Sequence, residues 1–448
     1  MIENQKKEKT VAIIGRPNVG KSTFFNRLVG RRIAIEAPIA GTTRDRLMGE
    51  VSWGYDKFIL IDVAGIEFGS KKELEKSMQE GVQLALETAD LVLFMVDWTD
   101  PDNETDKIVA RHLRQSGKPT LLVVNKADNL KRQENLDRFK RLGFQSPIPV
   151  SSISGTGSGD LLDRIVEELQ KTPAVSGITE PKPDDQIKLS IVGRPNVGKS
   201  TLLNTIIGEK RAVVSSEAGT TRDIISVSFS HLSQKVEIID TAGIRRPGKI
   251  GKDTIESFSL IRTYRAINNC DVAIVLIDAI EGLVALDANI LGRAIELGKA
   301  VVLAINKIDL VEEDQQEFMA KMIWRLQSQL NFAPWLPIIF VSAQDDQNIK
   351  SLLNQAINAY KARNTLIPED ELQSFLEVIK NSNNQLVSLI KFTQKSTNPP
   401  VFELKYKNKT PHPTQVRYIE NKLRDIYPMS GTPVFIDLIS TSRRRRRK

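Results

Sequence analysis

The chain has 448 residues, of which 40% are hydrophobic and 26% charged, a composition typical of a soluble globular protein. This length predicts about three domains of roughly 100–200 residues each. No apolar run approaches the roughly 18 residues of a membrane-spanning helix. The first ten residues, MIENQKKEKT, lack the apolar segment of a secretory signal. These features argue against a membrane or secreted protein, and we expect a cytoplasmic one.

The content of cysteine, histidine and charge narrows the function classes. Cys270 is the only cysteine, which excludes an internal disulfide, and three scattered histidines offer no zinc-ligand spacing. The net charge is +8. Residues 363–448 contain 16 Lys and Arg against 8 Asp and Glu, and the rest of the chain is balanced. Because the excess ends in Arg443–Lys448, the sequence RRRRRK, we expect an anionic partner there.

In chain order, the first feature is an exact internal repeat. The sequence GRPNVGKST occurs at Gly15–Thr23 and again at Gly193–Thr201. Three further motifs recur at nearly the same offsets: GTTRD at Gly41–Asp45 and Gly219–Asp223, D-x-A-G-I at Asp62–Ile66 and Asp240–Ile244, and N-K-x-D at Asn125–Asp128 and Asn306–Asp309. The repeated unit is therefore a whole domain rather than a short solenoid repeat.

Short apolar runs end directly at these motifs in both copies, for example VAIIG and FILIDVAG in the first. Between them lie segments with helical spacing, such as Glu73–Thr88 and Asp287–Leu297. This alternation predicts an α/β fold whose mainly parallel sheet is covered by helices on both faces. Ligands of such sheets gather at the carboxyl ends of the strands, where every motif falls.

We expect five segments along the chain. They are a first copy of the repeated α/β domain at 1–172, a Pro-rich linker at 173–186, a second copy at 187–362, a C-terminal α+β domain at 363–442 and a basic tail at 443–448. In the C-terminal domain the pattern predicts helices at Pro368–Asn381 and Pro413–Tyr427, and strands at Pro400–Tyr406 and Thr432–Ile439.

Both nonapeptides satisfy the phosphate-loop pattern G-x-x-x-x-G-K-S between a strand and a helix. The glycines let consecutive backbone N–H groups surround a phosphate, and the following helix adds the positive end of its dipole. Lys21 and Lys199 are expected to reach the β- and γ-phosphates, and Ser22 and Ser200 to ligate Mg²⁺. The predicted nucleotide-binding loop residues are Gly15, Arg16, Pro17, Asn18, Val19, Gly20, Lys21 and Ser22, with Gly193, Arg194, Pro195, Asn196, Val197, Gly198, Lys199 and Ser200.

The D-x-x-G motifs are candidates for a γ-phosphate sensor. Asp62 and Asp240 suit a carboxylate that holds Mg²⁺ through water, and the glycines offer a backbone N–H to the γ-phosphate. The predicted residues are Asp62, Val63, Ala64, Gly65 and Ile66, with Asp240, Thr241, Ala242, Gly243 and Ile244. Thr43 and Thr221 are the expected switch threonines that close on Mg²⁺ and phosphate, with Thr42 and Thr220 as alternatives.

The N-K-x-D motifs select the base. A carboxylate accepts two hydrogen bonds from the N1–H and exocyclic amine of guanine, which adenine lacks. Asp128 and Asp309 therefore indicate GTP rather than ATP. The predicted base-site residues are Asn125, Lys126, Ala127, Asp128 and Ser151, with Asn306, Lys307, Ile308, Asp309 and Ser342.

Taken together, the tandem G-x-P-N-V-G-K-S and duplicated GTTRD resemble the Der (EngA) family of bacterial double-domain GTPases, over nearly the whole chain. The resemblance implies a KH-like C-terminal domain and a role in maturation of the large ribosomal subunit. The partners would then be that subunit and its rRNA, with no membrane or DNA, and the protein a monomer. The first domain departs from the family pattern, because it reads DVAG where the family usually has D-T-G-G.

The water-orienting glutamine of many GTPases has no counterpart, because Ile66 and Ile244 occupy that position. The resemblance suggests that K⁺ held by Asn18 and Asn196 supplies the missing charge. The alternative is that these asparagines only favour a turn conformation. Two functional readings remain open: a tandem GTPase switch that hydrolyses GTP in both domains, or an assembly scaffold that hydrolyses it in only one.

Overall fold

The computed structural model describes residues 8–29, 48–63, 82–83, 85–128, 136–171, 186–210, 213–215, 226–239, 252–382, 386, 388–407 and 410–441. The chain forms two compact units, one of residues 5–180 and 249–262, the other of residues 1–4, 181–248 and 263–448. Among the described helices, none combines the length and apolar character needed to cross a bilayer.

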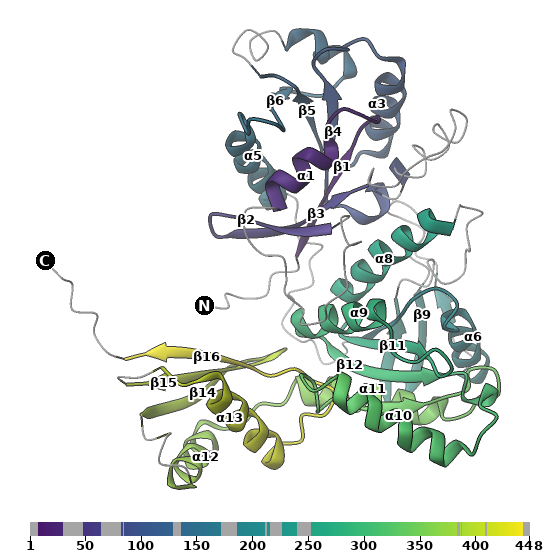
Figure 1. Ribbon diagram of the computed structural model, residues 1–448, viewed down its shortest axis with the longest axis vertical. Coiled ribbons are helices and arrows are strands. Elements are labelled where there is room, and N and C mark those ends of the chain that lie inside the picture. Colours follow the sequence, from purple (N-terminus) through teal and green to yellow (C-terminus); the bar gives the residue numbers. More distant parts are fainter. Residues whose placement is uncertain are drawn as a thin grey trace, which may run out of the picture. The chain divides into compact units, whose positions relative to one another are not determined.

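A six-stranded sheet forms the centre of the first GTPase domain, in the order β2-β3-β1-β4-β5-β6 (Figure 1). All neighbouring strands are parallel except β2 and β3. The prediction of a mainly parallel sheet is confirmed. The bounds are β1 Lys9–Ile14, β2 Met48–Trp53, β3 Asp56–Asp62, β4 Leu91–Asp97, β5 Thr120–Asn125 and β6 Ile148–Pro149.

Helices cover both faces of this sheet because alternate residues of the central strands are apolar on each side. On one face Val11 and Ile13 pack with residues of α1 (Lys21–Val29) and α5 (Ser158–Lys171). On the other, Ala12 packs in a cluster with α3 (Glu104–Ser116) and the 3₁₀ helix η1 (Asp137–Leu142).

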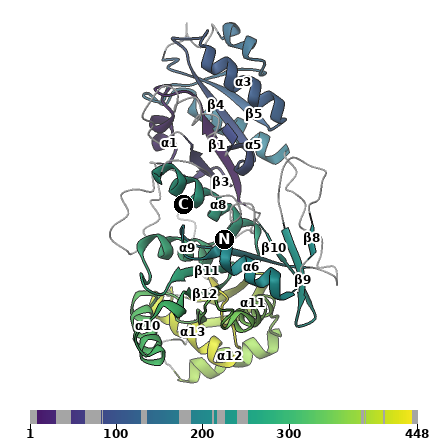
Figure 2. The same ribbon diagram turned by 90° about the vertical axis from the view of Figure 1, so that its right-hand side faces the viewer.

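The second GTPase domain repeats this plan with seven strands, in the order β13-β12-β11-β7-β10-β9-β8. The antiparallel strands β8 and β9 extend one edge (Figure 2). The strands are β7 Ile187–Val192, β8 Val213–Ser215, β9 Ser226–His231, β10 Gln234–Ile238, β11 Val272–Asp278, β12 Ala300–Asn306 and β13 Ile338–Phe340. The helices within residues 187–363 are α6 Lys199–Lys210, α8 Lys252–Asn269, α9 Ala285–Glu296, η2 Ile308–Leu310, α10 Gln315–Gln329 and α11 Ile349–Arg363, and the part of α8 up to Arg262 belongs to the first compact unit.

The C-terminal domain is α+β. Its elements are α12 Glu369–Ser382, β14 Leu389–Thr397, β15 Pro400–Tyr406, α13 Pro413–Ile426 and β16 Phe435–Ser440. The sheet order is β14-β15-β16, with β14–β15 antiparallel and β15–β16 parallel. Residues of α12 and α13 share one apolar core with β14 and β15. The predicted helices and two strands are present, β16 begins three residues later than predicted, and β14 was not predicted.

Within the second unit, Gly431 joins the C-terminal domain to the GTPase sheet. Its carbonyl accepts a 2.7 Å hydrogen bond from the Val301 amide in β12, and its own amide donates to the Trp335 carbonyl at 3.1 Å. The next residue, Thr432, is completely buried and donates from Oγ1 to the Ala359 carbonyl at 2.8 Å. Gly431 has φ +74°, and a Cβ there would lie 2.6 Å from the Ala359 Cβ. Only glycine fits this close approach.

Candidate functional site

The two phosphate loops have the same backbone conformation at their critical glycines. Gly20 and Gly198 have φ of +97° and +99°, a region that L side chains rarely adopt. A Cβ on Gly20 would lie 2.3 Å from Nδ2 of Asn125, and one on Gly198 would lie 2.2 Å from Nδ2 of Asn306. The glycines thus bring each phosphate loop against the asparagine of its own base motif.

Asn18 and Asn196 occupy the tip of each loop. Both are exposed, and their φ angles of 65° and 66° lie in the left-handed region that asparagine tolerates better than most residues. The turn conformation that the sequence suggested for this residue is therefore present in both copies. An exposed amide oxygen at this place also suits a cation ligand, so the two readings are compatible.

The loop lysines are held on backbone carbonyls. Lys21 Nζ donates to the Arg16 carbonyl at 2.6 Å, and Lys199 Nζ donates to the carbonyls of Gly193 and Arg194 at 2.8 and 2.6 Å. Burial lowers the pKa of each lysine to about 8, and the Asp62 carboxylate acts in the opposite direction on Lys21. A largely buried ammonium group whose described hydrogen bonds go to neutral carbonyls is well placed to bind an anion entering the loop.

Asn125 links three loops of the first site. Its Nδ2 donates to the Val19 carbonyl at 2.6 Å, and its Oδ1 accepts from the Ser152 amide at 2.9 Å. Asn306 makes the equivalent bonds to the Val197 carbonyl at 2.9 Å and from the Ala343 amide at 3.0 Å. Each asparagine therefore ties its phosphate loop to the last loop of the site.

The base-recognition aspartates have different surroundings. Ser151 Oγ donates to Oδ1 of Asp128 at 2.5 Å. In the second domain, Ser342 Oγ accepts from the Asp345 amide at 3.0 Å, as Ser151 Oγ accepts from the Ser154 amide at 3.2 Å, but no bond from Ser342 to Asp309 is among the described contacts. Oδ1 of Asp309 is buried without a hydrogen-bond partner among the described residues. An orphaned carboxylate oxygen fits a site whose ligand supplies the missing N–H donors.

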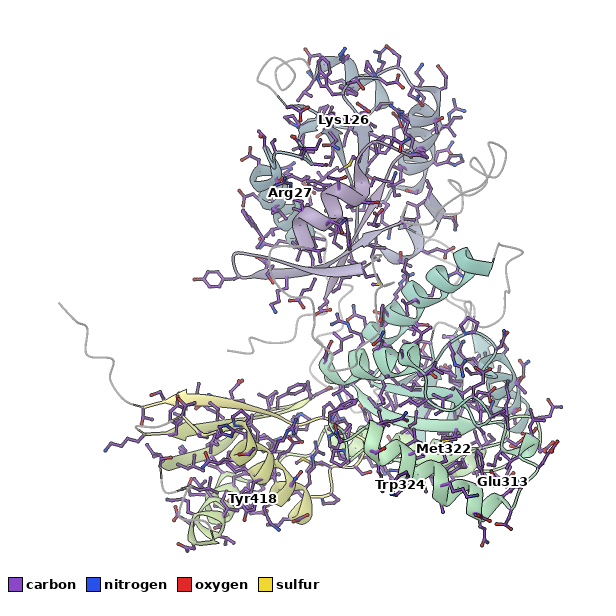
Figure 3. All side chains as sticks on the ribbon, in the orientation of Figure 1. Arg27, Lys126, Glu313, Met322, Trp324 and Tyr418 are labelled. Atoms are coloured by element: carbon purple, nitrogen blue, oxygen red, sulfur yellow. The ribbon has the colours of Figure 1, made fainter. Side chains whose placement is uncertain are left out.

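The motif lysines are fixed by residues that sequence reasoning missed. Lys126, labelled in Figure 3, and Lys307 both have positive φ, 64° and 70°. Their Nζ atoms pair with the carboxylates of Asp97 and Asp278 at 2.5 and 2.6 Å. The same separation of 29 residues in both copies was the signal that could have revealed them.

Arg27, also labelled in Figure 3, is a second missed contributor. From α1, its Nε donates to the Ser152 carbonyl at 2.6 Å, beneath the last loop of the first site. In the second domain Thr205 of α6 donates to the Ala343 carbonyl at 2.7 Å. The helix after the phosphate loop therefore supports the last loop in both domains with different side chains.

Several predicted residues lie outside the described ranges: Thr43, Ala64, Gly65, Ile66, Thr221, Asp240, Thr241, Ala242, Gly243 and Ile244. Their roles stay predictions. Asp62 is 1% exposed at the end of β3, and Val63 is also buried. Ser22 and Ser200 are exposed in the first turn of α1 and α6, where a hydroxyl can reach an ion beside the loop.

A family model described as 50S ribosome-binding GTPase matches residues 10–126 and 188–307, one match in each copy of the repeat. GTPase Der of Chloroflexus aggregans is 42% identical over 452 residues, covering 98% of this chain and 99% of the relative. GTPase Der of Staphylococcus epidermidis is 38% identical over 433 residues, covering 95% and 98%.

The chain belongs to the Der family of GTPases. A GDP- and AlF4⁻-bound structure of Era from Aquifex aeolicus is also similar, with 24% identity, a TM-score of 0.30 and coverage of 56% of this chain and 92% of that one. As a Der-family protein the chain binds guanine nucleotide with Mg²⁺ and hydrolyses GTP. The glycine-formed loops, the buried lysines and the orphaned oxygen of Asp309 fit that ligand.

Proposed function

We propose that this Der-family chain is a tandem GTPase switch that acts in assembly of the large ribosomal subunit. The main observation behind this proposal is that both phosphate loops have the same backbone angles at the second glycine and the asparagine, and that both loop lysines donate to the carbonyl of the loop arginine. Both domains therefore have a loop suited to binding a nucleotide. The description of the family model as a 50S ribosome-binding GTPase supports the ribosomal role.

In the proposed mechanism, Lys21 and Lys199 leave their backbone carbonyls and bind the β- and γ-phosphates. The loop N–H groups and the N-termini of α1 and α6 stabilise the negative charge. Ser22 and Ser200 would hold Mg²⁺ together with Thr43 and Thr221, and with Asp62 and Asp240 through water. Mg²⁺ would neutralise charge that develops on the phosphate oxygens.

We also propose that Asn18 and Asn196 hold K⁺, which supplies positive charge in place of a catalytic side chain. GTP turnover should then rise markedly when Na⁺ is replaced by K⁺ at equal ionic strength, and Asn18→Ala with Asn196→Ala should remove the difference between the salts. Equal rates in both salts would refute the K⁺ role.

The ribosomal role is tested by sedimentation with ribosomal subunits in GDP and in a non-hydrolysable GTP analogue. We expect cosedimentation with the large subunit in one nucleotide state and release in the other. Cosedimentation that does not depend on the nucleotide would exclude a switch. The single-site variants Lys21→Ala and Lys199→Ala, assayed separately for turnover, distinguish a switch with two active sites from a scaffold with one.

The C-terminal domain and its basic tail are the proposed rRNA contact. The domain combines a three-stranded sheet with two helices on one face, as a KH-like domain would. If all six charges of Arg443–Lys448 neutralise phosphates, deleting them should reduce the slope of log affinity against log salt by about 5. An unchanged slope would remove the tail from the interface. We also propose that the protein is a cytoplasmic monomer and that its domain boundaries lie at residues 172, 186, 362 and 442.

A further inference from the structure

The second residue of each phosphate loop is an arginine whose side chain is held by a buried acid. Arg16 Nε donates to Oδ2 of Asp106 at 3.2 Å, and Arg16 Nη2 lies 3.1 Å from Oδ2 of Asp100. The Asp106 side chain is only 3% exposed. Asp106 is the third residue of α3, the helix that follows β4. The arginine therefore links the phosphate loop to the first turn of that helix.

The second domain has an ion pair at the same place, although Arg194 Nε makes no hydrogen bond within the described residues and Oδ2 of Asp287 accepts from the Val284 amide at 3.3 Å. Arg194 Nε lies 3.3 Å from Oδ2 of Asp287, whose side chain is fully buried and is the third residue of α9. Glu281, which also pairs with Arg194, stands six positions before Asp287, as Asp100 stands six before Asp106. The two domains therefore retain the same pair although the residues around it differ.

Fold stability alone is a poor explanation for these pairs. Removing a carboxylate and a guanidinium from water costs more than a well-packed apolar pair would. Oδ1 of Asp106 and Oδ1 of Asp287 are buried without a hydrogen-bond partner among the described residues. Burial raises the pKa of both carboxyls, for Asp106 to about 6. Incompletely satisfied buried charges are typical of functional sites.

The arginine also connects the pair to the nucleotide lysine. The backbone carbonyl of Arg16 accepts from Lys21 Nζ, and that of Arg194 accepts from Lys199 Nζ, both at 2.6 Å. Anchoring the arginine side chain therefore fixes the peptide group on which the lysine rests. The residue before each bonded carbonyl is a loop glycine, which offers no side-chain anchor of its own.

The segment that supplies these acids also holds the base loop. Asp97, the last residue of β4, pairs with Lys126, and Asp106 lies in the first turn of α3, at the other end of the loop that joins the two elements. In the second domain, Asp278 ends β11 and Asp287 lies in the first turn of α9. One short segment in each domain is thus fastened to both the phosphate loop and the base lysine.

We propose that Asp106 and Asp287 are positioning residues that hold the phosphate loops in their nucleotide-binding conformation through Arg16 and Arg194. The proposal rests on the proposed role of these loops in holding the nucleotide phosphates. Misplacement of an active-site group by about 1 Å can lower the reaction rate by up to roughly a hundredfold. Loss of either acid should therefore weaken nucleotide binding in its own domain and leave the other domain unaffected.

The test measures the Kd for a fluorescent GDP analogue, one site at a time, on the full chain. In a Lys199→Ala background, Asp106→Asn should raise the first-site Kd by about tenfold or more. The matched control is Glu104→Gln, because Glu104 lies in the same helical turn, is 82% exposed and pairs only with Lys107 in the described contacts. In a Lys21→Ala background, Asp287→Asn is compared with Glu296→Gln in the same way.

A stability effect is separated from positioning by replacing the whole pair. Arg16→Met with Asp106→Leu removes both charges, so the thermal midpoint should recover relative to Asp106→Asn. Because the anchor is still missing, the Kd should stay raised. A Kd that returns to the parent value in the double variant, or that never changes in Asp106→Asn, would overturn the proposal. If Lys21→Ala in the same background also retains its affinity, the proposed nucleotide role of the loop fails instead.

Discussion

Ser151 Oγ donates a 2.5 Å hydrogen bond to Oδ1 of Asp128, whereas Oδ1 of Asp309 is buried without a hydrogen-bond partner among the described residues. Both serines, Ser151 and Ser342, accept a hydrogen bond from the amide three residues further on. The two base sites therefore have the same motif, but the hydrogen bonding of the base-recognition aspartate differs between them. In the first, the carboxylate is oriented by a neighbouring hydroxyl before any ligand arrives. In the second, the orienting group must come from the ligand.

Removing the hydroxyl should affect the two domains unequally. Ser151→Ala deletes a hydrogen bond to a charged group, worth roughly 1.5–3 kcal/mol, so the first-site Kd for GDP should rise by about tenfold to a hundredfold. Ser342→Ala should change the second-site Kd by less than about twofold. Fluorescent GDP titrations in the Lys199→Ala and Lys21→Ala backgrounds measure each site. Equal changes in Kd at the two sites would show that the hydrogen bond between Ser151 and Asp128 has no effect on affinity.

Base specificity should follow the N-K-x-D carboxylates. Asp309→Asn replaces an acceptor by an amide donor that faces the exocyclic amine of guanine, so second-site affinity for GTP should fall by roughly a hundredfold or more. Xanthine carries a carbonyl at that position, and XTP should restore binding. Competition titrations with GTP, XTP and ATP provide the measurement. A variant that binds XTP no better than the parent does would contradict the assignment.

Glycine is required at the end of the second phosphate loop. Gly198→Ala places a Cβ 2.2 Å from Nδ2 of Asn306 at φ +99°, so the loop must shift, and we expect loss of second-site binding with about 1–3 kcal/mol of destabilisation. The control is Gly208→Ala in α6, where a Cβ meets open space and helix propensity should slightly increase stability. Calorimetry with and without GDP measures both. Normal GDP binding by Gly198→Ala would contradict the close approach.

The first domain should have a pH-dependent stability that arises from Asp106. Burial raises its pKa from 3.8 to about 6, so the folded state binds more protons than the unfolded state between these values. The contribution is fully present below about pH 4 and is lost as pH rises through 6, by on the order of 3 kcal/mol. Asp106→Asn should lack this part of the slope. Parallel slopes for the nucleotide-free forms of both proteins from pH 4.5 to 7 would contradict this pKa.

The phosphate loops and central strands could be predicted because their signals are local. Strands such as Leu91–Asp97 and Val272–Asp278 are completely buried, and their continuous apolar sequences indicate this directly. The edge strand β2 has only one fully buried residue, Val51, and β14 has exposed polar residues over much of its length. Such strands form because a neighbour offers hydrogen bonds, which a single segment does not record.

The motif residues could be placed by their spacing, but their supporting contacts could not. The bond between Arg16 and Asp106 joins residues 90 positions apart, and that between Arg27 and the Ser152 carbonyl spans 125. Such pairs depend on how loops meet at the edge of the sheet, so a lone acid near a helix start indicates only a helix cap. The internal repeat could have revealed these acids, because Asp97, Asp100 and Asp106 in the first copy are matched at the same spacing by Asp278, Glu281 and Asp287 in the second.

The contact between Gly431 and Val301 has a mechanical consequence. Val301 lies at the start of β12, and the same strand ends at Asn306 and the base-recognition lysine. The stretch Val301–Asn306 spans about 17 Å, and β12 is paired on both sides by β11 and β13. The contact with the C-terminal domain and the base-recognition motif of the second site therefore lie on the same strand, and a shift at one end would reach the other through a continuous hydrogen-bonded ladder.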